Sequence, residues 1–180
     1  MNNYPFSDYS SCVSWIETQK RFNKKTSIDH MFYFCDLLGN PQKKFKSIHV
    51  TGTNGKGSVV SYLRSILCSN GLRVGTFTSP YIVKFNERIQ VNGEMITDEE
   101  VVELAKRVYD IYALIDENHP KPSFFEFTTL MSFVYFSKKS NIDLAIIEVG
   151  IDGLLDSTNV ITPIASVITN VAYDHMNVLG

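Results

Sequence analysis

The sequence predicts an α/β fold in which helices cover both faces of a mostly parallel sheet. Short apolar runs alternate along the chain with segments of helical periodicity. A glycine-rich segment lies directly between one apolar run and a helix, as it does in phosphate-binding βα units. The 180 residues are 44% hydrophobic and 20% charged, which is typical of a soluble globular domain and not of a disordered chain.

Charge and cysteine content narrow the class of protein. The net charge is −2, from 17 basic and 19 acidic residues, so the chain has no global attraction to nucleic acid or anionic membranes. Cys12, Cys35 and Cys68 are widely spaced and form no C-x-x-C pair, which predicts free, mostly buried thiols. No signal peptide and no apolar run of about 20 residues is present. We expect a cytoplasmic monomer that binds neither nucleic acid nor membrane.

Two helices are predicted before the first strand. The first covers about residues 9–19 and carries apolar positions at helical spacing. The second covers residues 28–38, with Ser27 before it as a candidate cap and with Gly39 and Pro41 after it as stop signals.

The first βα unit contains the glycine-rich segment. Ser47–Val50 is a short β-like run that leads directly into Thr51–Ser58. Residues 59–67 then have helical character, Gly71 ends the helix, and Arg73–Phe77 forms the second predicted strand.

A hairpin and a helix follow. Asn92-Gly93 between residues 89–91 and 94–96 is a strong signal for a hairpin turn. Thr97–Glu100 has the spacing of a capping box, and the helix behind it is predicted to reach about Ile115.

The last predicted elements are one helix and two strands. Ser123–Glu126 repeats the capping-box spacing and begins a helix that reaches about Ser137. Asp143–Val149 is apolar except for its first residue and Glu148, as expected for a strand that is buried on both faces, and Ile164–Thr169 is a similar run.

The segment between the first strand and its helix is suited to binding phosphate. Glycines allow successive N–H groups to face one anion, and the N-terminus of the helix adds positive potential. Lys56 can reach terminal phosphates, and the Ser58 hydroxyl can bind Mg²⁺. The match to G-x-x-x-x-G-K-[ST] is imperfect, because Val50 takes the first glycine position and Gly57 separates the lysine from the serine. A plain glycine-rich turn is the alternative to a nucleotide site formed by Gly52, Thr53, Asn54, Gly55, Lys56, Gly57 and Ser58.

Several further segments share a family pattern with this loop. They are His49–Ser58, Phe77–Tyr81, Phe85–Ile89, Phe124–Phe127, Glu148–Gly150, Asp156–Asn159 and Asp174–His175. In this order and spacing they resemble the folylpolyglutamate and dihydrofolate synthases of the Mur-ligase group. The resemblance implies a three-layer domain like those of P-loop nucleotide hydrolases. It also implies an enzyme that uses ATP and Mg²⁺ to join L-glutamate, through an acyl phosphate, to a folate or dihydropteroate carboxylate. Which of these two acceptors is used stays open.

The resemblance assigns roles to residues outside the loop. A lone carboxylate such as Glu148 in an apolar strand is costly unless it is paired or bound to metal, and the family uses the matching residue as a Mg²⁺ ligand. By resemblance, Ser79 and His175 are also metal ligands, although a loop serine and a lone histidine would otherwise be read as structural. Lys56, Glu148 and His175 are therefore the expected catalytic residues. Phe125 and Asp156 are expected to contact the pterin end of the substrate.

Two departures from the family pattern concern sequence and length. Asp152 replaces a glycine and Leu154 replaces an arginine, and we expect Asp152 to weaken activity more than stability. Family members also continue beyond the position of Gly180 into a C-terminal domain that helps to bind glutamate. We therefore expect residues 1–180 to be the N-terminal part of the ATP-binding domain, with helices over residues 1–45 and the αβ core over 46–180, and to be inactive alone. The alternatives are a nucleotide-binding module without catalysis and, less well supported by the loop pattern, a small-molecule kinase.

Overall fold

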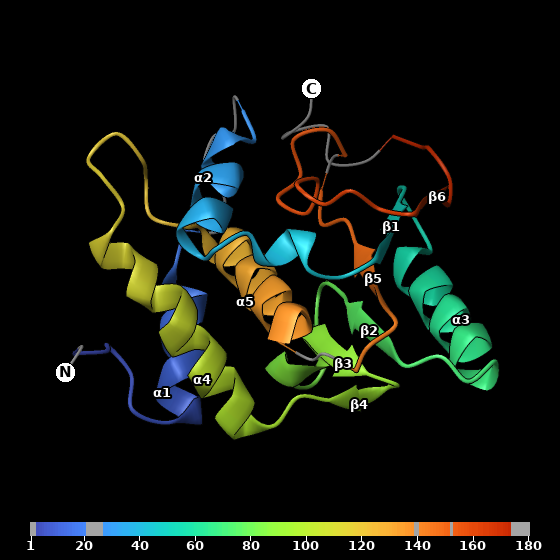
Figure 1. Cartoon of the computed structure of the whole chain (residues 1–180), viewed down its shortest axis with the longest axis horizontal. Coiled ribbons are helices and arrows are strands. Elements are labelled where there is room, and N and C mark those ends of the chain that lie inside the picture. Colours follow the sequence, from blue (N-terminus) through green and yellow to red (C-terminus); the bar gives the residue numbers. More distant parts are fainter. Residues whose placement is uncertain (1–2, 21–26, 139–140, 152, 174–180) are drawn as a thin grey trace.

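The computed structural model describes residues 3–20, 27–138, 141–151 and 153–173. These residues form a sheet whose strands are β1 (Ser47–Thr51), β2 (Val74–Phe77), β3 (Ile89–Val91), β4 (Glu94–Met95), β5 (Leu144–Glu148) and β6 (Ala165–Ile168). The strand order is β4-β3-β2-β5-β1-β6 (Figure 1). β2, β5, β1 and β6 run parallel, whereas β3 pairs antiparallel with β2 and β4. The predicted α/β class with a mostly parallel sheet is confirmed.

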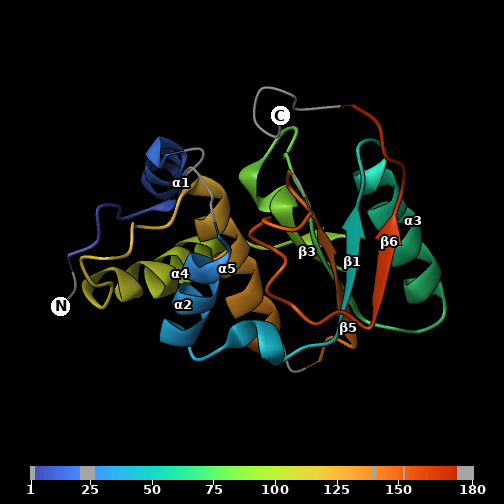
Figure 2. The same ribbon diagram turned by 90° about the horizontal axis from the view of Figure 1, so that it is seen from above.

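Helices cover the sheet unequally on its two faces. The α-helices are α1 (Tyr9–Thr18), α2 (Asp29–Leu37), α3 (Lys56–Ser69), α4 (Asp98–Tyr109) and α5 (Phe124–Lys138). The short 3₁₀ helices are η1 (Pro41–Lys43), η2 (Phe85–Arg88) and η3 (Asp110–Ala113). Figure 2 shows α3 on one side of the strands and the other α-helices on the opposite side. The predicted three-layer arrangement is therefore present.

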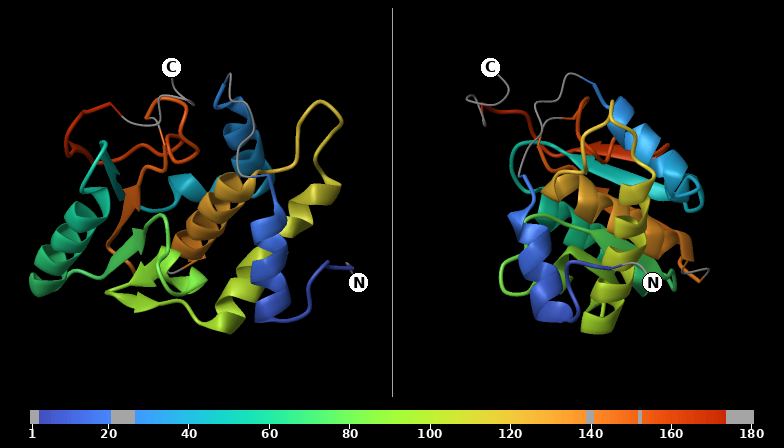
Figure 3. Two further views of the ribbon diagram at one scale, coloured as in Figure 1. Left: turned by 180° about the vertical axis from the view of Figure 1, so that it is seen from behind. Right: turned by 90° about the vertical axis from the view of Figure 1, so that its left-hand side faces the viewer.

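The larger core lies between the sheet and α5. This helix is buried around its whole circumference, since every residue from Glu126 to Phe136 is buried. α1 and α4 pack beside it, which Figure 3 shows from behind. A smaller core under α3 contains Val50, Val60 and Ile146. The N-terminal helices thus share a core with α4 and α5, and the predicted boundary at residue 45 stays a prediction.

Local signals account for most element boundaries. The hydroxyl of Thr97 accepts the Glu100 N–H at 3.2 Å, and the Glu100 carboxylate accepts the Thr97 N–H at 2.9 Å, which is the predicted capping box of α4. Asn92 and Gly93 both have positive φ, as the predicted hairpin turn requires. α4 ends at Tyr109 and continues as η3 to Ala113, so the helix predicted to reach Ile115 changes type near its end.

β6 differs in burial from its counterpart β5. All five residues of β5 are buried, whereas β6 is mostly exposed because it lies at the edge of the sheet formed by the described residues. The cysteines agree with their prediction, since Cys12 and Cys35 are buried and Cys68 is half-buried, all as free thiols. None of the helices described is long and apolar enough to cross a membrane.

Candidate phosphate-binding and metal site

Four parallel strands bring their carboxyl ends to one edge of the sheet. β1 leads into the glycine-rich loop, and β5 ends on Glu148. β2 leads to Thr78 and Ser79, and β6 leads to Thr169. α/β proteins bind their ligands at this edge. The topology therefore places the predicted phosphate loop, Ser79 and Glu148 in one region.

The phosphate loop depends on glycine at two positions. Gly55 caps α3 with a φ of 79°. Gly52 has a φ of 131°, and a Cβ on it would lie 2.1 Å from Thr169 Oγ1. α3 then begins at Lys56, and its first backbone bond runs from Val59 N–H to the Gly55 carbonyl. The N–H groups of the first turn are thus free of intrahelical partners, as an anion site requires.

Residues after β6 hold the loop in place, which the sequence patterns did not reveal. The Asn170 carbonyl accepts the Thr53 N–H at 3.0 Å, and its side-chain oxygen accepts the Asn54 N–H at 2.9 Å. The Thr169 hydroxyl donates to the Asn54 carbonyl at 2.7 Å. The only sequence signal for this role is the place of Thr169-Asn170 at the end of an apolar run.

Lys56 folds back over the loop that it follows. Its Nζ donates to the carbonyls of Gly52 at 2.8 Å and Thr53 at 3.3 Å. The ammonium group is therefore already at the loop, where it can exchange these carbonyls for phosphate oxygens.

We expect Lys56→Ala to weaken ATP binding by the chain about tenfold or more, because one charge-assisted hydrogen bond contributes about 1.5–3 kcal/mol. Isothermal titration calorimetry on the wild type and the variant measures this effect. Lys46→Ala, which removes a lysine before β1, is the matched control and should bind as the wild type does. Equal affinity in Lys56→Ala would remove this residue from the site.

Glu148 ends a buried strand with its carboxylate facing the loop. The side chain is buried, and Oε2 accepts the Ser79 N–H at 3.0 Å. A Cβ on Gly57 would lie 3.8 Å from Oε1, an ordinary contact distance, so this carboxylate lies directly beside the start of α3. Burial raises the pKa of Glu148, whereas the Ser79 N–H and the charges of Lys56 and Arg88 oppose the rise. These groups offset only part of the cost of burying the charged form.

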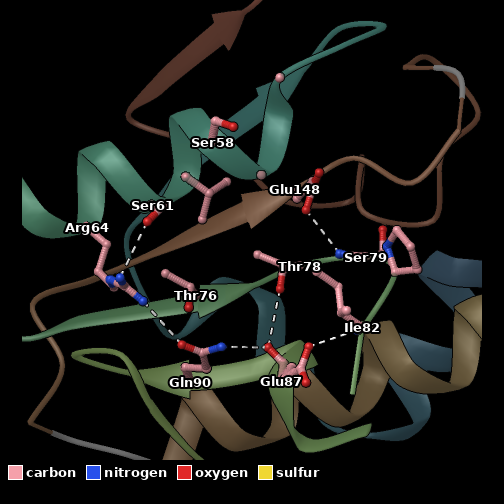
Figure 4. A pocket seen from close by; sticks show the side chains of 14 residues that line it. Ser58, Ser61, Arg64, Thr76, Thr78, Ser79, Ile82, Glu87, Gln90 and Glu148 are labelled. Atoms are coloured by element: carbon pink, nitrogen blue, oxygen red, sulfur yellow. Dashed lines mark hydrogen bonds between the residues drawn. The ribbon is translucent and has the colours of Figure 1, made fainter. Parts of the chain in front are cut away.

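A pocket of about 440 Å³ lies between the first half of α3 and β2 and β3 (Figure 4). The residues that line it include Gly57, Ser58, Arg64, Thr76, Thr78, Ser79, Glu87, Gln90 and Glu148. Figure 4 shows Glu148 between Ser58 on α3 and Ser79 on the opposite wall. The pocket therefore joins the phosphate loop to the predicted metal ligands.

These residues fit a magnesium ion that is shared with phosphates. Mg²⁺ prefers oxygen ligands and is commonly held by one or two carboxylates together with water and substrate phosphates. The Glu148 carboxylate and the hydroxyls of Ser58 and Ser79 supply oxygen only. Over the described parts of the chain, no group of three or more His, Cys, Asp or Glu side chains forms a metal cluster of its own. His175 and Asp152 lie outside the described residues.

Phe125 and Asp156 lie beside the loop that follows β5. The Phe125 ring would be only 2.6 Å from a Cβ on Gly150, so it packs directly on that backbone. The buried Asp156 carboxylate accepts the N–H groups of Gly150 at 3.1 Å and Ile151 at 3.0 Å through one oxygen. Its other oxygen accepts from the N–H and hydroxyl of Thr158. Asp156 thus shapes the loop by accepting four hydrogen bonds from it. Its contact with a pterin stays a prediction. Leu154 is exposed on the same loop.

His49 connects this loop to β1. Its Nε2 lies 2.8 Å from the Thr158 hydroxyl, which in turn contacts Asp156. Burial lowers the pKa of His49 below its ordinary value of 6.5, and the charge of Asp156 opposes the change only in part. These contacts describe a structural role for His49.

The lowered pKa of His49 predicts a loss of stability in acid. The imidazole of His49 binds a proton more tightly in the unfolded chain than in the folded one. Its contribution to folding stability is therefore complete above pH 6.5 and is lost as the pH falls toward the lower pKa of the folded chain. Between pH 7.5 and 5.5, His49→Gln should lose fewer degrees of melting temperature than the wild type, by about 2–4 °C per kcal/mol of linkage. Other titrating groups are common to both proteins and cancel in the difference. Parallel curves would contradict this role.

Comparisons with known proteins show the family of the chain. The model of the Mur ligase middle domain matches residues 50–180. The chain is 44% identical to a dihydrofolate synthase/folylpolyglutamate synthase of Bacillus subtilis over 97% of its own length and 41% of the relative's. It is 41% identical to a folylpolyglutamate synthase of Lacticaseibacillus casei, over 96% and 41%. The chain thus spans about two fifths of the length of the curated relatives that it matches.

Solved structures show the same similarity. A complex of FPGS with AMPPCP and folate superposes with a TM-score of 0.90 at 41% identity, over 97% of this chain and 43% of that one. A folylpolyglutamate synthase of Mycobacterium tuberculosis complexed with ADP gives a TM-score of 0.86 at 34% identity, over 96% and 38%.

Proposed function

The chain belongs to the Mur ligase middle-domain family, and we propose that it forms the ATP-binding part of a ligase that joins L-glutamate to a folate or dihydropteroate carboxylate. One observation carries the proposal most directly. The free N-terminus of α3 and the Glu148 carboxylate lie around one pocket, Lys56 folds back over the adjoining glycine-rich loop, and Phe125 packs on the loop after β5. The curated relatives at 44% and 41% identity are synthases of this kind, which favours a ligase over a module that binds nucleotide without catalysis.

The proposed reaction needs no nucleophile from the protein. An oxygen of the acceptor carboxylate attacks the γ-phosphorus of ATP, and ADP leaves with the electron pair of the broken P–O bond. The amino group of glutamate then attacks the acyl carbon, loses a proton, and displaces inorganic phosphate. The result is one amide bond for each ATP that is cleaved.

The residues of the chain contribute by position and charge. The N–H groups at the start of α3 hold the phosphates, and Lys56 neutralises their negative charge. When bound, Mg²⁺ would supply further charge neutralisation, and Glu148, Ser79 and Ser58 are the described residues that would hold it. We extend the metal role to His175, as the family resemblance implies. The carbonyl contacts of Lys56 and the Glu148–Ser79 bond orient these groups before substrate arrives.

A glutamate-dependent assay tests the proposal. The complete product of the gene is incubated with Mg-ATP, with L-glutamate, and with either tetrahydrofolate or dihydropteroate, and products are identified by mass. We expect ADP release that requires both glutamate and acceptor, together with a product heavier by one glutamyl residue. ADP release that does not depend on glutamate would refute the proposed ligase activity. A comparison of the two acceptors distinguishes folylpolyglutamate synthesis from dihydrofolate synthesis. A monomeric state, a cytoplasmic location and the absence of nucleic-acid and membrane binding stay predictions.

A further inference from the structure

Arg88 is a buried cation without a described anion to balance it. It ends η2, and its side chain is 5% exposed. Its Nε and Nη1 are enclosed and have no hydrogen-bond partner among the described residues. Ion pairs in these parts of the chain involve Lys84, His119 and Lys138, and Arg88 takes part in none. A guanidinium group stays charged in proteins, so two unpaired donors in a buried position require an explanation.

Aromatic rings surround this guanidinium and provide only part of what it needs. Its central carbon lies 4.9 Å from the ring centroid of Phe124, 5.2 Å from that of Tyr81 and 5.9 Å from that of Phe85. Stacking of this kind stabilises the charge but leaves the in-plane N–H groups unused. Burial lowers the pKa of Arg88 despite the opposing charges of Tyr81, Glu17 and Glu148.

The two nearby carboxylates are already engaged elsewhere. Glu17 accepts the hydroxyl of Tyr81, and Glu148 accepts the Ser79 N–H. Neither forms an ion pair with Arg88 in the described structure. The guanidinium is thus prepared for an anion that the described residues do not supply.

The position of Arg88 indicates where that anion comes from. Phe124 is adjacent in the chain to Phe125, the residue proposed to contact the pterin, whereas Glu148 belongs to the phosphate and metal end of the site. Arg88 is related to both ends, because its guanidinium lies over the ring of Phe124 and its charge acts on that of Glu148. Resting on the function proposed above, we propose that Arg88 pairs with a carboxylate of the acceptor substrate and makes the site specific for acidic acceptors.

Paired ligands test this assignment directly. Folate and its diamide, in which both carboxylates are carboxamides, are titrated into the 180-residue chain in the presence of Mg²⁺ and AMPPCP. The wild type should bind folate about 10–100-fold more tightly than the diamide, as expected for a charge-assisted bidentate pair. In Arg88→Gln the preference should fall to about threefold or less, because a glutamine side chain carries no charge. Pteroate and its amide form a second pair, which distinguishes a benzoate carboxylate from the glutamate carboxylates of folate.

Two variants control for charge and folding. Lys84→Gln removes an exposed cation from the same loop, one that pairs with Asp98 at 2.6 Å, and it should keep the wild-type preference. Arg88→Lys keeps the charge but loses the planar fork, so its preference should lie between those of the wild type and Arg88→Gln. If Arg88→Gln does not melt cooperatively, Arg88→Lys carries the test, with a loss of at least about fivefold expected from the missing bidentate geometry.

The outcomes separate this inference from the proposed function. Failure of the wild type to bind AMPPCP would refute the nucleotide site itself. Normal AMPPCP binding with no preference for carboxylates over amides, or with no binding of any acceptor, would overturn the role of Arg88 alone. A full preference in a folded Arg88→Gln or Arg88→Lys variant would overturn it as well.

Discussion

Replacement of Gly52 by alanine is expected to abolish measurable nucleotide binding. A Cβ at this position would lie 2.1 Å from the Thr169 hydroxyl and 2.9 Å from the Asn170 carbonyl. The Asn170 carbonyl belongs to the backbone that anchors the phosphate loop, so the clash cannot be relieved by rotating one side chain. The φ of 131° adds strain that glycine alone avoids. The loop must therefore move away from β6, and its N–H groups lose their common direction.

Calorimetry with Mg-ATP on the 180-residue chain measures this effect. Gly71→Ala is the matched control, because Gly71 lies past the far end of α3 and also has a positive φ, of 82°, but a Cβ on it would meet nothing within 4 Å. That variant should lose about 1 kcal/mol of stability, because alanine is strained in the left-handed region, and it should keep its affinity for ATP. We expect Gly52→Ala to lose at least about 100-fold in affinity, the equivalent of roughly 2.8 kcal/mol. Wild-type affinity in Gly52→Ala would show that the loop does not need its described conformation.

The phosphate loop could be predicted from sequence because its signals are local. A strand, a glycine-rich turn, Lys56 and a helix follow one another within about twenty residues, and local geometry follows from residue type. The buried position of Glu148 could be predicted for a similar reason, since it is the single carboxylate near the end of an apolar run, whereas its role as a metal ligand stays a prediction. The resemblance supplied the roles proposed for Ser79 and Phe125, which no local rule distinguishes from ordinary loop and core residues.

The parts that escaped prediction depend on contacts between distant segments. The bond from Asn54 N–H to Asn170 joins residues 116 positions apart, and it exists only because β6 pairs with β1. The exposure of β6 has the same origin, since an apolar run does not reveal whether its strand is central or at an edge. Arg88 was visible within a motif, but its enclosure by Phe124 and Tyr81 arises from tertiary packing.

Replacement of Glu148 by glutamine is expected to remove the magnesium dependence of the site without unfolding it. The amide keeps the shape of the carboxylate but lacks the charge that a divalent cation requires. In the 180-residue chain, Mg²⁺ should increase the affinity of the wild type for AMPPCP and have little effect on Glu148→Gln. In the complete product of the gene, kcat should fall by about 10²–10³-fold, the usual cost of removing one preorganised charge-stabilising group.

The pKa of Glu148 makes the same variant informative about stability. Burial raises this pKa, so the folded chain favours the protonated carboxyl group. The contribution of Glu148 to folding stability is therefore complete below the ordinary pKa of 4.5. It is lost as the pH rises through the pKa of the folded chain. At pH 7.5 the neutral amide should therefore leave the melting temperature unchanged or raise it.

Glu87 provides the opposite case on the wall of the same pocket. Its carboxylate accepts the N–H groups of Ile82, Val83 and Lys84 at 2.8, 2.9 and 2.7 Å, and these bonds lower its pKa. The contribution of Glu87 to folding stability is thus present above its ordinary pKa and is lost in acid. Glu87→Gln should therefore lower the melting temperature at pH 7.5. Because its oxygens are held by backbone donors, that variant should keep the effect of Mg²⁺ on AMPPCP affinity. Loss of the Mg²⁺ effect in Glu87→Gln, or its survival in Glu148→Gln, would show that the metal site has been assigned to the wrong carboxylate.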